Sequence, residues 1–179
     1  IQLEQATYAS SVIQTSGTAI TRVADTASGS GNSTVINSSE GVLYANLSNI
    51  KSQNFDSIVI NNGIVDENNT VRIWFYNNTI TYQYKVGSAT SAQIASGTID
   101  LTSDTKIACS WKLNEFKLFV NGLQRGVTDT SGSVLANGTL ESVQFKRGNN
   151  TGNFYGKTKD LKLYNTALTD AELTTLTTL

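Results

Sequence analysis

The sequence predicts an all-β fold in which two antiparallel sheets pack face to face and a short helix ends the chain. Short runs of alternating apolar and polar residues, separated by turns rich in Asn, Gly, Ser and Thr, recur from Ser39 to Tyr164. Helical signals begin only at Thr169. A length of 179 residues suits one domain. Antiparallel strands in this number need two packed sheets to bury their apolar faces.

The clearest expected hairpin spans residues 71–84, with Asn77 and Asn78 as its two-residue turn. Asparagine tolerates the positive φ that both central positions of such a turn require. Alternation then places six apolar residues on one face: Val71, Ile73, Phe75, Ile80, Tyr82 and Tyr84. The opposite face mixes aromatic and hydrogen-bonding side chains: Arg72, Trp74, Tyr76, Thr79, Thr81 and Gln83.

A second expected hairpin joins residues 106–111 to residues 116–120, and Asn121-Gly122 then turns the chain into a further strand. Alternation predicts one core face made of Ile107, Cys109, Trp111, Phe116, Leu118 and Val120, with Phe119 facing away. Cys109 is the only cysteine, so no internal disulfide can form. A loop is expected over residues 28–34, and further strands over residues 41–47, 57–61, 93–101 and 140–145.

The end of the chain predicts a strand followed by a short helix. Leu161 and Leu163 alternate with lysines, as in a half-buried strand. Thr169 and Glu172 have the spacing of a capping box, in which each residue hydrogen-bonds the other's backbone N–H. A helix is therefore expected from Thr169 to Leu179.

This terminal run, with Tyr164-Asn165 closing the strand and Ala-Leu-Thr before the acidic helix start, resembles the signature of laminin G-like, concanavalin A-like jelly-roll domains. The hairpin over residues 111–122 is similar as well. The resemblance implies a jelly roll over residues 20–179. The segment up to Asp25 resembles a linker of bacteriophage structural proteins and bacterial surface proteins. Residues 1–19 are therefore expected to be a linker or the end of a preceding module in a longer chain.

The chemistry of the side chains argues against an enzyme. The chain has no histidine, which excludes histidine-based triads and histidine metal sites. Glycoside hydrolysis needs two carboxyl groups about 5–10 Å apart. Asp66 and Glu67 are adjacent, so on a strand they would point to opposite faces. We expect them in a turn with a structural role.

The resemblance also raises the possibility of a calcium site, because many domains of the resembled family bind this ion. The family's usual aspartate ligand, at the start of the last strand, corresponds to Lys159 in this chain. An ammonium group cannot coordinate calcium, and Asp160 is displaced by one residue toward the other face. No metal ligand and no cofactor are assigned, and calcium held by other loop oxygens stays an open alternative.

Sugar recognition needs aromatic faces and hydrogen-bonding groups rather than titratable ones. Two groups of residues meet this need: the outward face of the first hairpin and a pair of aromatic residues in a late loop. The candidates are Arg72, Trp74, Tyr76, Thr81 and Gln83, and then Phe154 and Tyr155. The alternatives are that the hairpin face is a packing surface or subunit contact, and that the loop pair is an apolar lid on the core.

The expected function is a non-catalytic module of a bacteriophage tail or head fibre that recognises a glycan on the host surface, within a longer chain and in a homotrimer. One alternative is a carbohydrate-binding module of a secreted bacterial polysaccharide-active enzyme or adhesin. The other is a structural spacer or capsid-decoration domain. The expected location is the virion surface, or alternatively the secreted fraction or bacterial cell surface.

Two classes of partner are excluded by charge and hydropathy. The net charge is −1 and the basic residues are scattered, so nucleic acid is not an expected partner. No apolar run approaches the roughly 20 residues that span a bilayer, so a membrane is not expected either.

Overall fold

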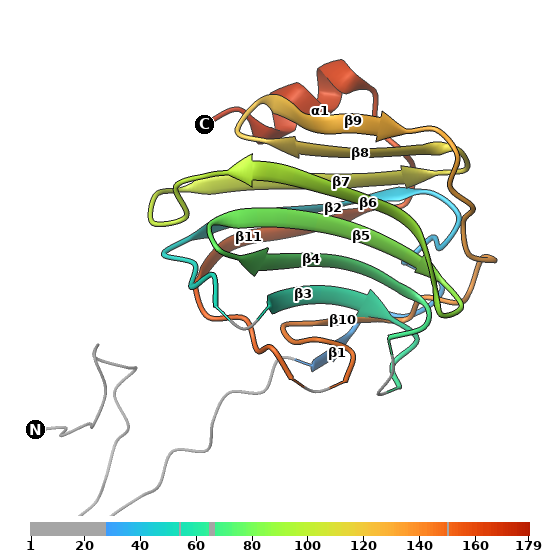
Figure 1. Ribbon diagram of the computed structural model, residues 1–179. Helices are drawn as coiled ribbons and strands as arrows, with labels where there is room; N and C mark the ends of the chain where they lie inside the picture. The colour runs from blue at the N-terminus through green and yellow to red at the C-terminus, as the bar shows by residue number, and fades with distance from the viewer. Residues whose placement is uncertain (1–27, 54, 65–66, 150) are drawn as a thin grey trace, which may run out of the picture.

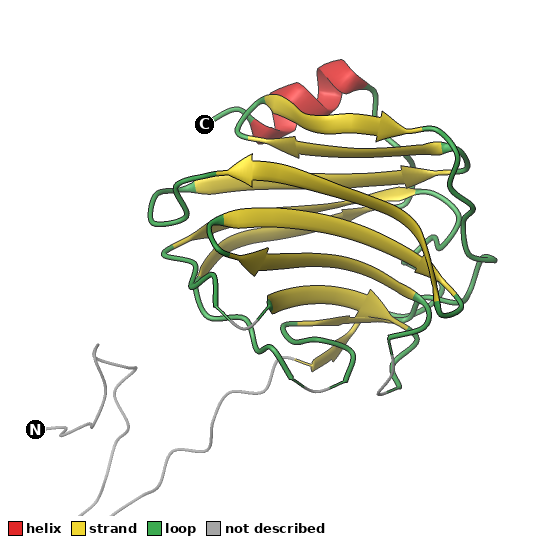
Figure 2. Ribbon diagram, viewed as in Figure 1, coloured by secondary structure: helices red, strands yellow, loops and turns green. Residues whose placement is uncertain are grey.

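The computed structural model describes residues 28–53, 55–64, 67–149 and 151–179, and shows two antiparallel sheets packed face to face (Figures 1 and 2). The predicted all-β, two-sheet jelly roll is confirmed. The six-stranded sheet runs in the order β1 (Ser28–Ser30), β10 (Ser142–Gln144), β3 (Asp56–Asn61), β4 (Thr70–Tyr76), β5 (Thr79–Val86) and β6 (Ala89–Thr98). The five-stranded sheet runs in the order β11 (Lys157–Tyr164), β2 (Gly41–Ser48), β7 (Thr105–Lys112), β8 (Glu115–Val120) and β9 (Leu123–Asp129).

The β4–β5 hairpin has the predicted register. Phe75 lies opposite Ile80, and Asn77 and Asn78 have φ values of 48° and 56°. These positive values are those of a tight two-residue turn. The six apolar residues predicted for one face are all fully buried and belong to the main core between the sheets.

The β7–β8 hairpin also agrees with the sequence, and its six predicted core residues are fully buried. The polar groups of two buried aromatic side chains are hydrogen-bonded. The Tyr82 hydroxyl donates to the Ser110 carbonyl at 3.2 Å, and the Trp111 Nε1–H donates to the Asn37 carbonyl at 3.2 Å. Such bonds remove most of the cost of burying a polar group. Cys109 is buried, and burial raises the pKa of its thiol.

Some element bounds differ from the sequence-based expectation. β6 begins at Ala89 rather than near residue 93, β10 covers only three residues, and the expected loop at residues 28–34 contains β1, which pairs with β10. Strand pairing uses backbone groups that every non-proline residue carries, so a Gly/Ser segment can form an edge strand without an apolar pattern. The predicted linker over residues 1–19, and the domain start at residue 20, lie outside the described residues.

The helix α1 (Asp170–Thr177) starts with the predicted capping box. The Thr169 N–H donates to Glu172 Oε2 at 2.8 Å, and the Glu172 N–H donates to Thr169 Oγ1 at 3.4 Å. α1 packs on the outer side of the five-stranded sheet, where Leu173 joins Val42, Ala108 and Phe119 in a second, smaller core (Figure 1). No helix in the described ranges is long and apolar enough to cross a membrane.

Candidate functional site

The side of β4 that faces away from the core carries Arg72, Trp74 and Tyr76. Their cross-strand neighbours on β5 include Gln83 and Thr81. α1, the one helix of the described residues, covers the other sheet, so helical structure does not cover this side (Figure 2). Phe55, Glu67 and Arg147 reach the same surface through the contacts described below. We call the surface made by these eight side chains the β4 face.

Two arginines of the β4 face converge on one carboxylate. Arg147 donates from Nε to Glu67 Oε1 at 2.7 Å and from Nη2 to Oε2 at 3.0 Å. Arg72 donates from Nη1 to Glu67 Oε1 at 3.1 Å. Arg72 belongs to β4 and Arg147 to the loop after β10. Glu67 therefore joins two parts of the chain that are far apart in sequence.

The electrostatics of this cluster follow from its geometry. The hydrogen bonds from Arg147 lower the pKa of Glu67 below its ordinary value, and the charges of Arg147 and Arg72 add to this effect. Burial lowers the pKa of Arg72 to about 10, against the opposing attraction of Glu67. The Glu67 carboxylate accepts three charge-assisted hydrogen bonds, two from Arg147 and one from Arg72.

Arg72 is also fixed by its neighbours within the sheet. Its guanidinium carbon lies 4.1 Å from the centre of the Trp74 ring, a cation–π contact. Its Nη2 donates to Gln83 Oε1 at 3.1 Å. Gln83 in turn donates from Nε2 to Thr90 Oγ1 and Gln93 Oε1. One face of Trp74 is thus taken by Arg72, and the polar atoms of Gln83 are engaged inside the protein.

Phe55 and Tyr76 form the exposed aromatic part of the β4 face. Their rings stack with centroids 4.5 Å apart and an interplanar angle of 7°. The two residues are 40% and 41% exposed. Phe55 has a φ of 57°, which is strained for a bulky side chain. The guanidinium carbon of Arg147 lies 5.9 Å from the centre of the Phe55 ring, so the aromatic pair adjoins the charged cluster.

The predicted hairpin residues do come together on one surface, with different exposures. Tyr76 is exposed and Trp74 half-buried, whereas Thr81 and Gln83 are buried and Arg72 is largely buried. Gln83 holds Arg72 by a hydrogen bond, and contact of Thr81 and Gln83 with a ligand stays a prediction. Sequence reasoning missed three members of the face, since no local pattern marks Phe55, Glu67 or Arg147.

The second predicted pair lies elsewhere. Phe154 packs against Phe75 and Phe145, with centroids 5.7 Å and 5.9 Å apart, on the core side of β4. This placement corresponds to the expected alternative of an apolar lid. Tyr155 is 54% exposed, and its ring lies 5.8 Å from Lys51 Nζ. Ligand contact by this pair remains a prediction, and no contact described here joins it to the β4 face.

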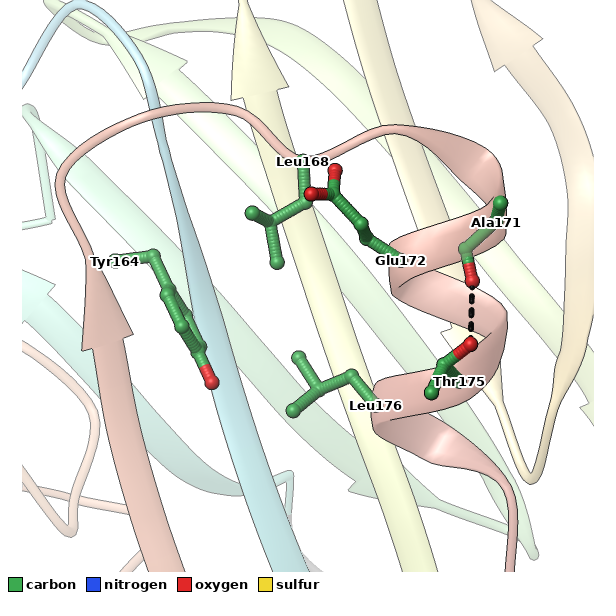
Figure 3. Close-up of a pocket in the computed structure, with 6 residues that line it drawn as sticks. All are labelled: Tyr164, Leu168, Ala171, Glu172, Thr175 and Leu176. Atoms are coloured by element: carbon green, nitrogen blue, oxygen red, sulfur yellow. Dashed lines mark hydrogen bonds between the residues drawn. The ribbon is translucent and has the colours of Figure 1, made fainter.

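A separate groove of about 450 Å³ runs between α1 and the end of β11. It is lined by Tyr164, Leu168, Ala171, Glu172, Thr175 and Leu176. Figure 3 shows the Tyr164 ring facing the side chains of Leu168 and Leu176, with Thr175 bonded to the Ala171 carbonyl at 2.9 Å. The groove is mainly apolar, and its residues border the smaller core under α1. The cap residue Glu172 is the one charged residue among those that line the groove.

The acidic residues near the expected calcium position are paired with lysines. Lys159 forms an ion pair with Asp104, and Lys162 Nζ lies 2.6 Å from Asp160 Oδ2. Within the part of the chain that the structure describes, no group of three or more His, Cys, Asp or Glu side chains could hold a metal ion. Calcium held by loop oxygens stays the open alternative that the sequence analysis named.

Comparison with solved structures relates this architecture to carbohydrate-binding modules. The CBM40 module of the Ruminococcus gnavus IT-sialidase has a TM-score of 0.68 and 15% identity, covering 87% of this chain and 96% of the module. The same module bound to α2,3-sialyllactose has a TM-score of 0.64 and 16% identity, covering 86% and 95%. Domain 4 of AbnA, an extracellular arabinanase of Geobacillus stearothermophilus in complex with arabinotriose, has a TM-score of 0.58 and 18% identity, covering 82% and 70%. At these identities the likeness shows a shared fold.

Sequence comparison extends this result to family membership. Curated protein sequences give no match. The profile of the Laminin_G_3 family matches residues 43–174, which run from β2 into α1 and include most of the strands of both sheets. The chain belongs to the Laminin_G_3 family of the concanavalin A-like lectin/glucanases superfamily.

Proposed function

We propose that this domain is a non-catalytic carbohydrate-binding module that contacts its glycan with the β4 face. The observation that carries the proposal is the exposed Phe55–Tyr76 stack, held beside the Arg147–Glu67–Arg72 cluster on the side that α1 does not cover. Aromatic rings pack on the C–H faces of sugars, and neighbouring polar groups orient the hydroxyls. The fold shared with two modules of carbohydrate-active enzymes supports the same assignment.

The carboxyl groups near this surface are poorly suited to catalysis. A general acid needs a raised pKa, but the arginines lower the pKa of Glu67. The pKa of Asp56 is raised by burial. Asp56, however, is only 3% exposed and lies opposite Phe75 on the core side of the sheet. The two carboxyl groups are therefore on opposite sides of the strands and cannot flank one glycosidic bond from the β4 face.

The comparisons favour a module of a secreted bacterial polysaccharide-active enzyme over the bacteriophage fibre that the N-terminal resemblance suggested. The similar structures described above are domains of a sialidase and an arabinanase. A location outside the cell, and attachment to further modules of a longer chain, belong to this proposal. The homotrimer expected for a fibre has no support from these structures.

A glycan array followed by titration calorimetry tests the proposal. We expect the wild-type domain to bind glycans and release no reducing ends from them. Tyr76→Ala should weaken binding about fivefold, since stacking of one aromatic ring contributes roughly 1 kcal/mol. Leu113→Ala is the matched control, because Leu113 is 58% exposed in the β7–β8 turn.

Two results would contradict this assignment. Loss of binding in Tyr155→Ala, with Tyr76→Ala unchanged, would move the site to the loop at Tyr155. A wild-type domain that binds no glycan on the array would instead support a structural spacer that buries the β4 face in a contact with another protein.

A further inference from the structure

Both arginines of the β4 face hydrogen-bond one carboxylate of the protein, that of Glu67. Arg147 directs its Nε and Nη2 groups to the two oxygens of Glu67, the bidentate geometry with which arginine binds any carboxylate. Arg72 adds a third hydrogen bond to Oε1. Glu67 therefore occupies the place where these two arginines would otherwise hold the carboxylate of a bound molecule.

Both terminal nitrogens of Arg72 are engaged, while its Nε is buried without a hydrogen-bond partner among the described residues. One terminal nitrogen bonds Gln83, and the guanidinium lies on the Trp74 ring. Its side chain is 11% exposed, against 26% for Glu67. The charge of Lys85 also lowers the pKa of Glu67, by less than the arginines do. The Glu67 side chain is thus more accessible to a ligand than the Arg72 side chain, and about as accessible as that of Arg147, which is 25% exposed.

We propose that Glu67 is a specificity-determining residue that makes the β4 face select neutral glycans over carboxylated ones. The inference rests on the proposed function, because it assumes that a glycan reaches this surface. A carboxylated sugar would meet the negative charge of Glu67 at the point where it needs a cation. Displacing Glu67 exchanges one arginine–carboxylate pair for another and leaves a carboxylate unpaired, which is costly at a partly buried position.

A neutral sugar avoids this cost. Glu67 Oε2 accepts one hydrogen bond from Arg147, and a carboxylate oxygen has two lone pairs. A sugar hydroxyl can therefore donate to Oε2 while both arginines stay in place, and the ring can pack on the neighbouring Phe55–Tyr76 stack. Of the two ligands named for the similar structures, arabinotriose is neutral and sialyllactose carries a carboxylate. We infer that the ligand of this chain is neutral, as arabinotriose is.

The test uses pairs of glycans of which one member is neutral and the other carboxylated: lactose with 3′-sialyllactose, and fully methyl-esterified oligogalacturonate with the free acid. Affinities are measured by calorimetry for wild type, Glu67→Gln and Glu115→Gln. Gln keeps an oxygen acceptor for the arginines but removes the charge. Glu115 is a carboxylate paired with Lys117 on β8, in the other sheet, so its replacement controls for a general change in net charge.

We expect wild type to bind the neutral member of each pair at least about tenfold more tightly than the carboxylated member, because two like charges that face each other in a site repel. Glu67→Gln should reduce this ratio about tenfold or reverse it, and Glu115→Gln should leave it unchanged. Thermal melting of each variant confirms that it is folded. The wild-type preference is informative even if a variant fails to fold.

The outcomes separate this inference from the proposed function. Tighter binding of the carboxylated member by wild type, or an unchanged ratio in folded Glu67→Gln, overturns the role of Glu67 while leaving a glycan-binding module. If wild type binds neither glycan and Glu67→Gln binds the carboxylated one, the charge of Glu67 does exclude carboxylated glycans. The assignment of a neutral ligand to the wild-type domain is then wrong. Absence of binding by both proteins overturns both proposals.

Discussion

The outward faces of the two sheets carry similar aromatic residues but are covered in different ways. On the five-stranded sheet, Phe119 is 3% exposed because α1 lies over it and places Leu173 in the same cluster. On the six-stranded sheet, Trp74 is covered on one side by the Arg72 guanidinium and stays half-buried. Phe55 and Tyr76 beside it keep about two fifths of their surface exposed.

This difference shows that an aromatic residue on the outward side of a strand does not by itself mark a binding site. Whether such a residue stays accessible depends on the helix or side chain that packs over it. A helix that packs an apolar side chain such as Leu173 on the sheet covers one face and extends the core, whereas a charged side chain gives a surface that stays polar and accessible. The candidate site is therefore on the sheet whose aromatic residues are held by arginines.

The strongest test of the comparison uses two neighbours on β4. Phe75→Ala should destabilise the domain by about 3–5 kcal/mol, because Phe75 is fully buried and its removal leaves a cavity. Trp74→Ala should cost only about 1–2 kcal/mol, mainly the cation–π contact with Arg72 and partial burial. Urea denaturation measures both. Equal losses in the two variants would mean that the β4 face is packed inside the protein like the core side.

The helix-covered face is tested by Leu173→Ala. Leu173 is fully buried against the five-stranded sheet, so we expect a loss of about 2–3 kcal/mol, at the lower end for such a substitution because α1 can settle onto the sheet. Glycan affinity should not change, since α1 and the β4 face lie on different sheets. Reduced affinity in a folded Leu173→Ala domain would show that the groove beside α1 takes part in binding.

The sequence predicts the local parts of this fold well, for a physical reason. In a two-residue hairpin the turn sets the register, and alternation then assigns each side chain to a face, so the pairing of Phe75 with Ile80 follows from neighbouring residues alone. The capping box at Thr169 is equally local. The strand bounds at β6 and the existence of β1 were missed, because an edge strand can pair through its backbone without an apolar pattern.

The candidate site could be predicted only in part, because three of its eight residues join it through contacts between distant segments. Arg72, Trp74 and Tyr76 share a face by alternation within one strand. Arg147 meets Glu67 across 80 positions of sequence, and Phe55 reaches Tyr76 only because the chain enters β3 with a positive φ. No spacing rule links these residues. Glu67 was accordingly expected to have only a structural role in a turn.

The smallest expected effect concerns the pH dependence of the charged cluster. The arginines hold the pKa of Glu67 below its ordinary value of 4.5, so the ionised carboxylate is favoured in the folded state. A group with a lowered folded-state pKa adds stability that is complete above its unfolded pKa and is lost as the pH falls through the folded value. The advantage of wild type over Glu67→Gln should therefore be constant from neutral pH down to about 5 and decline below it.

We expect this advantage to be about 1 kcal/mol or less, because the Glu67 and Arg147 side chains are about one quarter exposed and water screens their attraction. Urea denaturation of both proteins between about pH 7 and pH 3 measures it. A difference that persists unchanged at the lowest pH would show that ionised Glu67 gains nothing from the arginines in the folded state. Arg72 and Arg147 would then be held in place by packing on Trp74 and Phe55 rather than by the Glu67 carboxylate. The two sheets would differ in what packs on their outward aromatic residues, and electrostatic attraction would add nothing to that difference.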